Sequence, residues 1–206
     1  MIFLLFSSSI LLAADINIAS GDSIQSAINN AVSGDVLILA SGTYTECLDT
    51  SGKNLTIRGD STSTTTIDGS SCSTNSVVLV AGENVLFEQM SLKNTNGRVF
   101  SVESSTLTLD GVDISDSGTN SLHGPAIQAS NNATVTINNS NFENNGDSNG
   151  VIGGTIHVHD NVTLTVDSST FTDSYAYKGG AIFALNNCSI TINGSTFEGN
   201  MSSYTG

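Results

Sequence analysis

Apolar and polar residues alternate along most of this 206-residue chain, and the alternation returns at nearly regular intervals. A run of apolar, Thr, apolar and then Asp or Asn occurs four times, at 107–110, 135–138, 164–167 and 190–193. Weaker copies occupy 55–58 and 85–88. A period of two is typical of strands with one buried face, whereas a helix repeats every 3.6 residues. The pattern therefore predicts a chain of repeated short strands.

Two columns of residues keep a fixed distance from the start of each run. Seven residues on comes a large apolar residue, in the order Leu92, Ile114, Phe142, Phe171 and Phe197. Three residues later comes a small polar one, in the order Thr95, Ser117, Asn145, Ser174 and Asn200. An apolar pair also precedes each run, at 78 and 80, 100 and 102, 127 and 129, 156 and 158, and 182 and 184.

These copies are predicted to stack as the coils of a parallel β-helix. No copy can bury its apolar face alone, so each must rest on the next, with strand on strand at about 4.8 Å. Like residues then lie above like. The apolar column becomes a continuous core file, and the inward asparagines are expected to form a ladder of amides.

A different period precedes the first coil. Apolar residues recur at helical spacing after Ser20-Gly21-Asp22, which predicts a short amphipathic helix through Ile24, Ala27, Ile28 and Ala31. Asp22 or Ser23 is the expected N-cap, and Gly34 the expected stop. The strand 36–39 follows. A helix at this place is expected to cover the open edge of the stack.

Several segments resemble known families. The residues at 21–25, 31–36 and 41–44 resemble the first segment of pectin-lyase-like right-handed β-helix proteins. The later coils resemble the repeats of chlamydial polymorphic outer membrane proteins, marked by Gly-Gly-Ala-Ile and Phe-x-x-Asn. The tetrad is intact at 179–182 and varied at 124–127 and 153–156; Phe-x-x-Asn is kept at 142–145 and 197–200, and degraded at 171–174.

The resemblance implies a fold and a class of function. The fold is all-β, a right-handed single-stranded parallel β-helix, or three-faced solenoid, with a short N-terminal capping helix. The function is that of an extracellular passenger or stalk used in adhesion. We expect a signal peptide at 1–14, an N-terminal cap at 15–46 and coils at 47–206 that continue beyond the C-terminal end. A buried first strand is the alternative for 1–14, which is too short to span a membrane.

The net charge of the chain limits the classes of partner that we expect. The chain carries 5 basic and 19 acidic residues, a net charge of −14. Nucleic acids and anionic membrane surfaces both require a basic face, so neither is an expected partner. We expect a secreted or cell-surface protein that meets an unidentified glycan or protein, with no direct membrane insertion in this segment and no cofactor.

The spacing of the cysteines agrees with a secreted protein. Cys47 and Cys72 are close enough in sequence to bridge adjacent coils in a secreted chain. Cys188 is in register with Ala133 and Val162, so it is expected to be a small buried core residue and not a nucleophile.

Two groups of residues have side chains suited to metal binding or catalysis. His157 and His159 point outward on one strand beside Asp160, a set able to share a metal ion, but solvated strand histidines are the preferred interpretation and no metal site is assigned. Asp110, Asp113 and Asp116, with Asp167, are the carboxylates on which a polysaccharide lyase or hydrolase would depend. Turn formation explains the column Asp110, Asn138, Asp167 and Asn193 without catalysis, so no catalytic residue is assigned.

The outward positions offer another alternative. Thr106 and Thr108 begin a two-column array that continues with Thr134 and Thr136, Thr163 and Thr165, and Ser189 and Thr191. Such arrays resemble ice-binding faces, although β-branching alone favours Thr in strands. Acceptor sequences for N-glycosylation begin at Asn54, Asn132, Asn138, Asn161, Asn187, Asn193 and Asn200. The preferred hypothesis is a non-catalytic adhesion or recognition protein; enzyme and ice-binding protein remain the alternatives.

Overall fold

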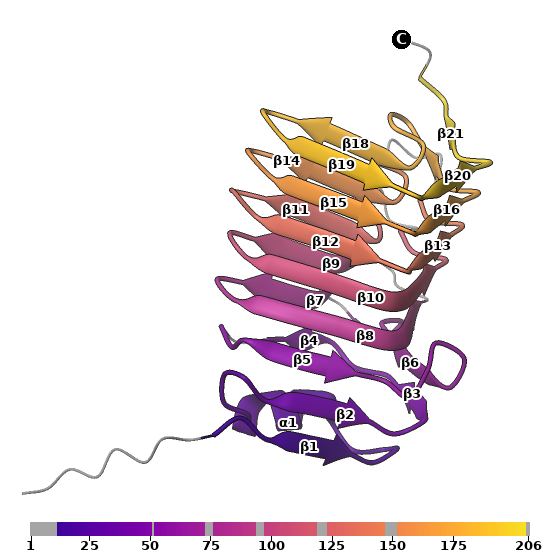
Figure 1. The fold of residues 1–206 in the computed structure, drawn as a ribbon. Helices are drawn as coiled ribbons and strands as arrows, with labels where there is room; N and C mark the ends of the chain where they lie inside the picture. Colours follow the sequence, from indigo (N-terminus) through magenta and orange to yellow (C-terminus); the bar gives the residue numbers. More distant parts are fainter. Residues whose placement is uncertain are drawn as a thin grey trace, which may run out of the picture.

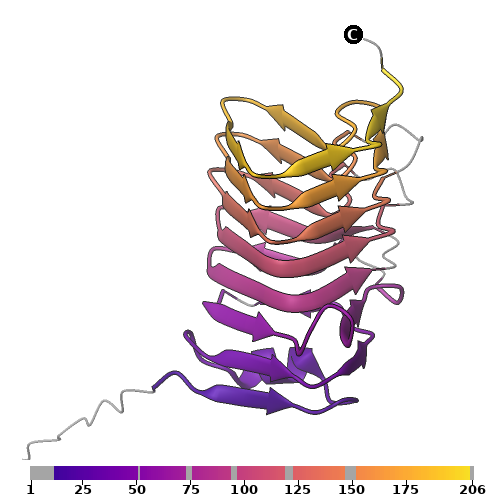
Figure 2. The same ribbon diagram turned by 45° about the vertical axis from the view of Figure 1, so that its right-hand side comes forward.

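The protein is a stack of β-strand coils that rises from the N-terminus to the C-terminus (Figures 1 and 2). The computed structural model describes residues 12–50, 52–72, 76–93, 97–118, 123–146 and 152–204. Most of the predicted signal peptide lies outside these residues. Thr95 of the small polar column also lies outside them. Every pairing between strands is parallel, as the stacked repeats predicted.

Two long faces run the height of the stack. The first, sheet A, consists of β1 (Asp15–Ile18), β2 (Val36–Leu39), β5 (Leu55–Arg58), β8 (Asn84–Lys93), β10 (Thr106–Ser115), β12 (Thr134–Asn138), β15 (Thr163–Asp167) and β19 (Ser189–Asn193). The second, sheet B, consists of β4 (Leu48–Asp49), β7 (Ser76–Ala81), β9 (Arg98–Glu103), β11 (Ile127–Ser130), β14 (Ile156–His159) and β18 (Ile182–Leu185).

A third, narrower face joins the two. It is made by β3 (Gly42–Tyr44), β6 (Thr65–Asp68), the ends of β8 and β10, β13 (Asn141–Glu143), β16 (Thr170–Thr172) and β20 (Thr196–Glu198). The long strands β8 and β10 bend from sheet A into this face (Figure 2). A short pair, β17 (Tyr175–Ala176) and β21 (Met201–Ser202), follows it in the upper coils.

The predicted core file is confirmed residue by residue. Leu92 pairs with Ile114, Ile114 with Phe142, Phe142 with Phe171, and Phe171 with Phe197. The three phenylalanine rings stack nearly parallel, with centroids 4.6 and 4.7 Å apart. The apolar pairs of sheet B are also in register from Val78 and Val80 up to Ile182 and Ala184. Stacking of like on like therefore fills the interior.

The small polar column is a mixed ladder and not the predicted ladder of amides. Asn145 accepts a hydrogen bond from the Ser117 N–H at 3.2 Å and donates one to the Ile114 carbonyl at 3.1 Å. One coil higher, the Asn145 N–H donates to the Ser174 hydroxyl. Serine and asparagine thus alternate along the file, and each supplies a partner for a buried backbone group. This role explains why Asn follows Phe by three residues in the Phe-x-x-Asn motif.

The Gly-Gly motif has a steric cause. The backbone of Gly154 lies against that of Gly180 in the next coil, and a Cβ on Gly154 would overlap the Gly180 carbonyl oxygen. The amide of Gly154 donates to the Gly179 carbonyl at 2.8 Å. Glycine is therefore required by this close approach of two coils.

The N-terminal helix α1 (Ile24–Asn30) covers the lower edge of sheet B. Ser23 is its N-cap, and the Glu46 carboxylate accepts hydrogen bonds from the amides of Ile24 and Gln25 at 2.8 and 3.1 Å. The Gln25 side chain bonds both the N–H and the carbonyl of Asp49, the edge residue of β4. The helix thus supplies hydrogen-bond partners for backbone groups at the edge of β4, which would otherwise be open.

Three details of this region differ from prediction. The helix ends at Asn30, with Ala31 already extended, so Gly34 is not its stop. The lowest position of sheet A is filled by β1, which pairs with β2, and the helix packs against these two strands without extending the sheet. The strand β1 was not predicted, although Ile16 and Ile18 have the period-two spacing.

The disulfide between Cys47 and Cys72 is present, as predicted, with 5.6 Å between the Cα atoms. The prediction for Cys188 is wrong in part. Its register with Ala133 and Val162 holds, and both of those are fully buried, but Cys188 is only half-buried because it lies in the uppermost described coil. The same coil exposes the large apolar side chains Leu185, Ile190, Ile192, Phe197, Met201 and Tyr204.

Candidate functional site

The outer face of sheet A carries residues of one kind in vertical files. Thr106, Thr134, Thr163 and Ser189 pair in register, and so do Thr108, Thr136, Thr165 and Thr191. The predicted two-column array is therefore real over β10, β12, β15 and β19. A third file of Asp110, Asn138, Asp167 and Asn193 runs beside it.

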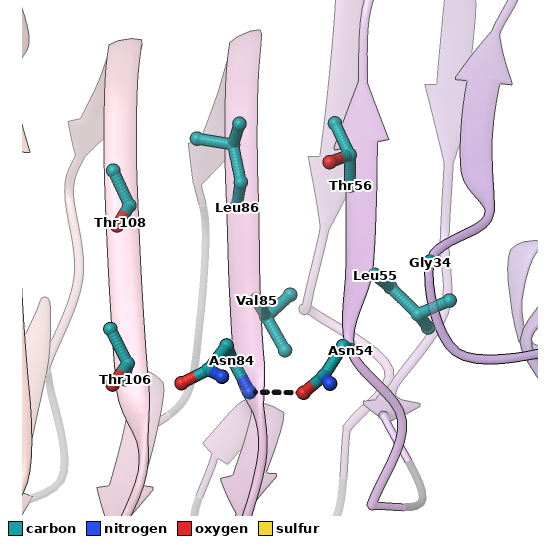
Figure 3. Close-up of a pocket in the computed structure, with 9 residues that line it drawn as sticks. All are labelled: Gly34, Asn54, Leu55, Thr56, Asn84, Val85, Leu86, Thr106 and Thr108. Carbon is teal, nitrogen blue, oxygen red and sulfur yellow. Dashed lines mark hydrogen bonds between the residues drawn. The ribbon is translucent and has the colours of Figure 1, made fainter. Parts of the chain in front are cut away.

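The lower end of this face is hollowed into a groove (Figure 3). The groove has a volume of about 220 Å³ and lies across β5, β8 and β10. Asn84 replaces Thr in the first file and Leu86 in the second. The Asn54 side-chain oxygen accepts a hydrogen bond from the Asn84 N–H at 2.9 Å. Figure 3 shows Leu86 between Thr56 and Thr108, with Asn84 between Asn54 and Thr106.

The groove combines two kinds of contact. Its polar groups are the amides of Asn54 and Asn84 and the hydroxyls of Thr56, Thr106 and Thr108, which can donate and accept hydrogen bonds. Leu86 offers an apolar surface between them. Asn84 and Leu86 stand where the two threonine files would continue, and no role was predicted for either residue. An outward leucine inside a polar file was the signal for this groove.

A second group gathers beside sheet B. The chain has three histidines, and their rings lie in a row: His123 is 5.5 Å from His157, and His157 is 5.1 Å from His159, between centroids. The ring of Phe183, one coil higher, is 5.8 Å from His157. His159 is fixed by Gln128 at 3.2 Å and by the Asp160 carboxylate at 2.7 Å.

His157 does not match the prediction of a solvated strand residue. Only 6% of it is exposed, and neither of its ring nitrogens has a hydrogen-bond partner. Burial, and to a smaller extent the nearby positive charges of His159, His123 and Arg98, together lower the pKa of His157 to about 4. His123 was missed because it comes from a separate segment before β11 and shares no register with His157.

The metal alternative gains no support from this arrangement. His159 and Asp160 are bonded to each other, and that bond is the main cause of the lowered pKa of Asp160. Within the described residues, no three His, Cys, Asp or Glu side chains are grouped so that they could hold a metal ion. The assignment of no metal site therefore stays a prediction.

The three aspartates proposed for the enzyme alternative are engaged separately. Asp110 accepts a hydrogen bond from the Asn139 amide at 2.9 Å, and Asp116 accepts one from the Asn144 amide at 2.6 Å. Asp113 bonds Thr62, and its pKa is raised because it is partly buried. Gly111, in a left-handed conformation, turns the chain between Asp110 and Asp113. Each of the three carboxylates thus bonds a different partner, and the enzyme alternative stays a prediction.

Comparison with known proteins identifies the fold family. The sequence pattern of the family described as "Right handed beta helix region" matches residues 20–197. This chain belongs to the right-handed beta helix family. The fold is thus a right-handed parallel β-helix, as predicted. No curated protein sequence shows significant similarity to the chain.

Two solved structures are similar in outline. A pectin methylesterase from carrot is 12% identical with a TM-score of 0.42, over 95% of this chain and 86% of that one. A PL6 family alginate lyase is 12% identical with a TM-score of 0.38, over 91% of this chain but 39% of that one. At these values neither similarity bears on activity. The finer resemblance to chlamydial repeats stays a prediction. The one helix of the described residues, α1, is too short to cross a membrane.

Proposed function

We propose that this β-helix is an extracellular recognition protein that binds a neutral glycan through the outer face of sheet A, without catalysis. The groove around Leu86 is the observation on which the proposal depends. A neutral sugar presents hydroxyl groups at its edges and C–H groups on its faces. The groove offers amides and hydroxyls for the former and Leu86 for the latter.

Charge decides between glycan classes. With a net charge of −14, the protein repels acidic polysaccharides at long range. The face itself carries the acidic file through Asp110 and Asp167, while Arg58 is already paired with Glu88. A neutral glycan avoids this repulsion. The threonine and asparagine files then extend the contact beyond the groove, one weak contact for each coil.

Replacement of one leucine tests the groove. We expect Leu86→Asp to weaken binding to a neutral-glycan array by at least about tenfold, because it removes the apolar contact and adds a charge. Leu79→Asp is the matched control, since Leu79 is an outward leucine of sheet B and 40% exposed. Equal losses in the two variants, or no binding to any neutral glycan by the parent protein, would contradict the proposal.

The register of the threonine files favours a second candidate, an ice-binding face. Regularly spaced Thr hydroxyl and methyl groups in two files give a flat repeating surface above the groove. This candidate predicts thermal hysteresis in the parent protein and its loss when Thr136 and Thr165 are both replaced by Tyr. A parent protein without hysteresis eliminates it.

A further inference from the structure

The corner between sheet B and sheet A changes in the upper coils. In the lower coils it has two residues, Gly82–Glu83 and Ser104–Ser105. In the upper coils it has three, which are Asn131-Asn132-Ala133, Asp160-Asn161-Val162 and Asn186-Asn187-Cys188. The flanking strands stay in register across this change, so each upper corner holds one additional residue.

The first and last residues of each long corner have structural roles. The Asn131 amide donates to the Glu103 carboxylate at 2.7 Å, and the Asn186 amide donates to the Asp160 carboxylate at 2.8 Å. The last residue turns inward, and Ala133 is fully buried. The first position therefore links one coil to the next by side-chain hydrogen bonds, and the third position contributes to the core.

The middle residue of each long corner is an exposed asparagine. Asn132, Asn161 and Asn187 have φ values of 62, 64 and 62°. The backbone at these positions is fixed, because the backbone N–H groups of Asn132 and Asn161 each donate a hydrogen bond at 2.9 Å to a carbonyl of the coil above. Their side-chain amides make no hydrogen bond within the described part of the chain. The left-handed conformation favours Asn or Gly but does not require a free amide.

Each free amide precedes a hydroxyl residue by two positions. Thr134, Thr163 and Ser189 stand there, and they form the first outward file of sheet A. Asn-x-Ser/Thr is the acceptor sequence for N-glycosylation. The three acceptors thus stand in one vertical file along an edge of the molecule.

We propose that Asn132, Asn161 and Asn187 form a file of N-glycan attachment sites. The proposal depends on the secretory route assumed in the proposed function. In the transfer, the Asn amide nitrogen bonds to C1 of the first sugar of a lipid-pyrophosphate-linked oligosaccharide. The bond from C1 to the pyrophosphate oxygen breaks, the lipid pyrophosphate leaves, and the amide nitrogen loses one proton.

Other acceptor sequences differ in structure and serve as internal comparisons. The Asn200 amide donates to the Phe171 carbonyl at 2.7 Å and accepts from the Ser174 N–H at 3.1 Å, so a sugar there would break the polar ladder. Two corners beside the groove, Gly82–Glu83 and Ser104–Ser105, are short and hold no acceptor, whereas the acceptor Asn54 lines the groove itself and its side-chain oxygen is bonded to the Asn84 N–H. Glycans on the upper corners would therefore border the upper face and leave this side of the groove open.

Secretion of the full chain from insect cells tests the proposal by glycopeptide mass spectrometry. We expect a sugar on at least one of the three corner asparagines and none on Asn200. The triple variant Thr134→Val, Thr163→Val and Ser189→Ala keeps the asparagines that the turns need and should lose the corner sugars. The control variant Thr108→Val, Thr136→Val and Thr165→Val changes the neighbouring file and should keep them.

A secreted, folded chain with all three corner asparagines unmodified would overturn the proposal, and so would corner sugars that persist in the first variant. That result would leave glycan recognition by the groove untouched. A chain that is not secreted would refute the extracellular route, and the proposed function would fail together with the glycan file.

Discussion

Phe171→Ala should lower the free energy of unfolding by about 3–5 kcal/mol. Phe171 is fully buried, and its ring is stacked between those of Phe142 and Phe197. The neighbouring coils are held by continuous backbone ladders, so they cannot close the space that the ring leaves. Urea unfolding, followed by circular dichroism, would measure the loss.

The same file supplies the control. Phe197 is in register with Phe171 but is 40% exposed, because it lies in the uppermost described coil. Phe197→Ala should therefore cost under about 2 kcal/mol, and Thr165→Ala on the outer face under about 1 kcal/mol. Equal losses at the three positions would mean that inward and outward residues are wrongly assigned.

Acid should destabilise the protein through His157. The pKa of His157 is about 4 in the folded protein, below its ordinary value of 6.5, so the unfolded chain binds the proton more tightly. The stability is complete above about pH 6.5 and falls as the pH drops towards 4. The loss from this one residue is at most about 3 to 4 kcal/mol, since each pKa unit corresponds to about 1.4 kcal/mol.

His157→Phe isolates this contribution. The next coil has Phe183 in register with His157, so a phenyl ring suits the position. We expect the variant to lose less stability than the parent between pH 6.5 and 4, while the two keep similar stability at pH 8. The comparison cancels the acid titration of carboxylates, which both proteins share. Parallel curves of stability against pH would contradict the buried, unpaired state of His157.

The core files could be predicted because identical spacing is visible in the sequence. Phe142, Phe171 and Phe197 recur with the period of the coils, and a parallel stack permits only one register in which their apolar faces all turn inward. The same reasoning located the threonine files and the apolar pairs of sheet B. Periodicity thus determined the strands and their facing.

The candidate sites depend on residues that break the period, and these were missed or misread. Leu86 matters because it interrupts a file of threonines. His123 reaches His157 from outside any strand, and a contact of that kind leaves no spacing to detect. β1 was overlooked because Ile16 and Ile18 are only two apolar positions. Long-range packing, which a single sequence does not display, decided each of these cases.

Distances measured by pulsed electron paramagnetic resonance would test the stacking most directly. With Cys188 replaced by Ser, spin labels at Thr56→Cys and Thr165→Cys are four coil steps apart, and labels at Thr56→Cys and Thr191→Cys are five. At about 4.8 Å for each step, the mean distances should be about 19 and about 24 Å. Two narrow distributions that differ by about one step would agree with a single outer file. Broad distributions, or a second distance no longer than the first, would contradict it.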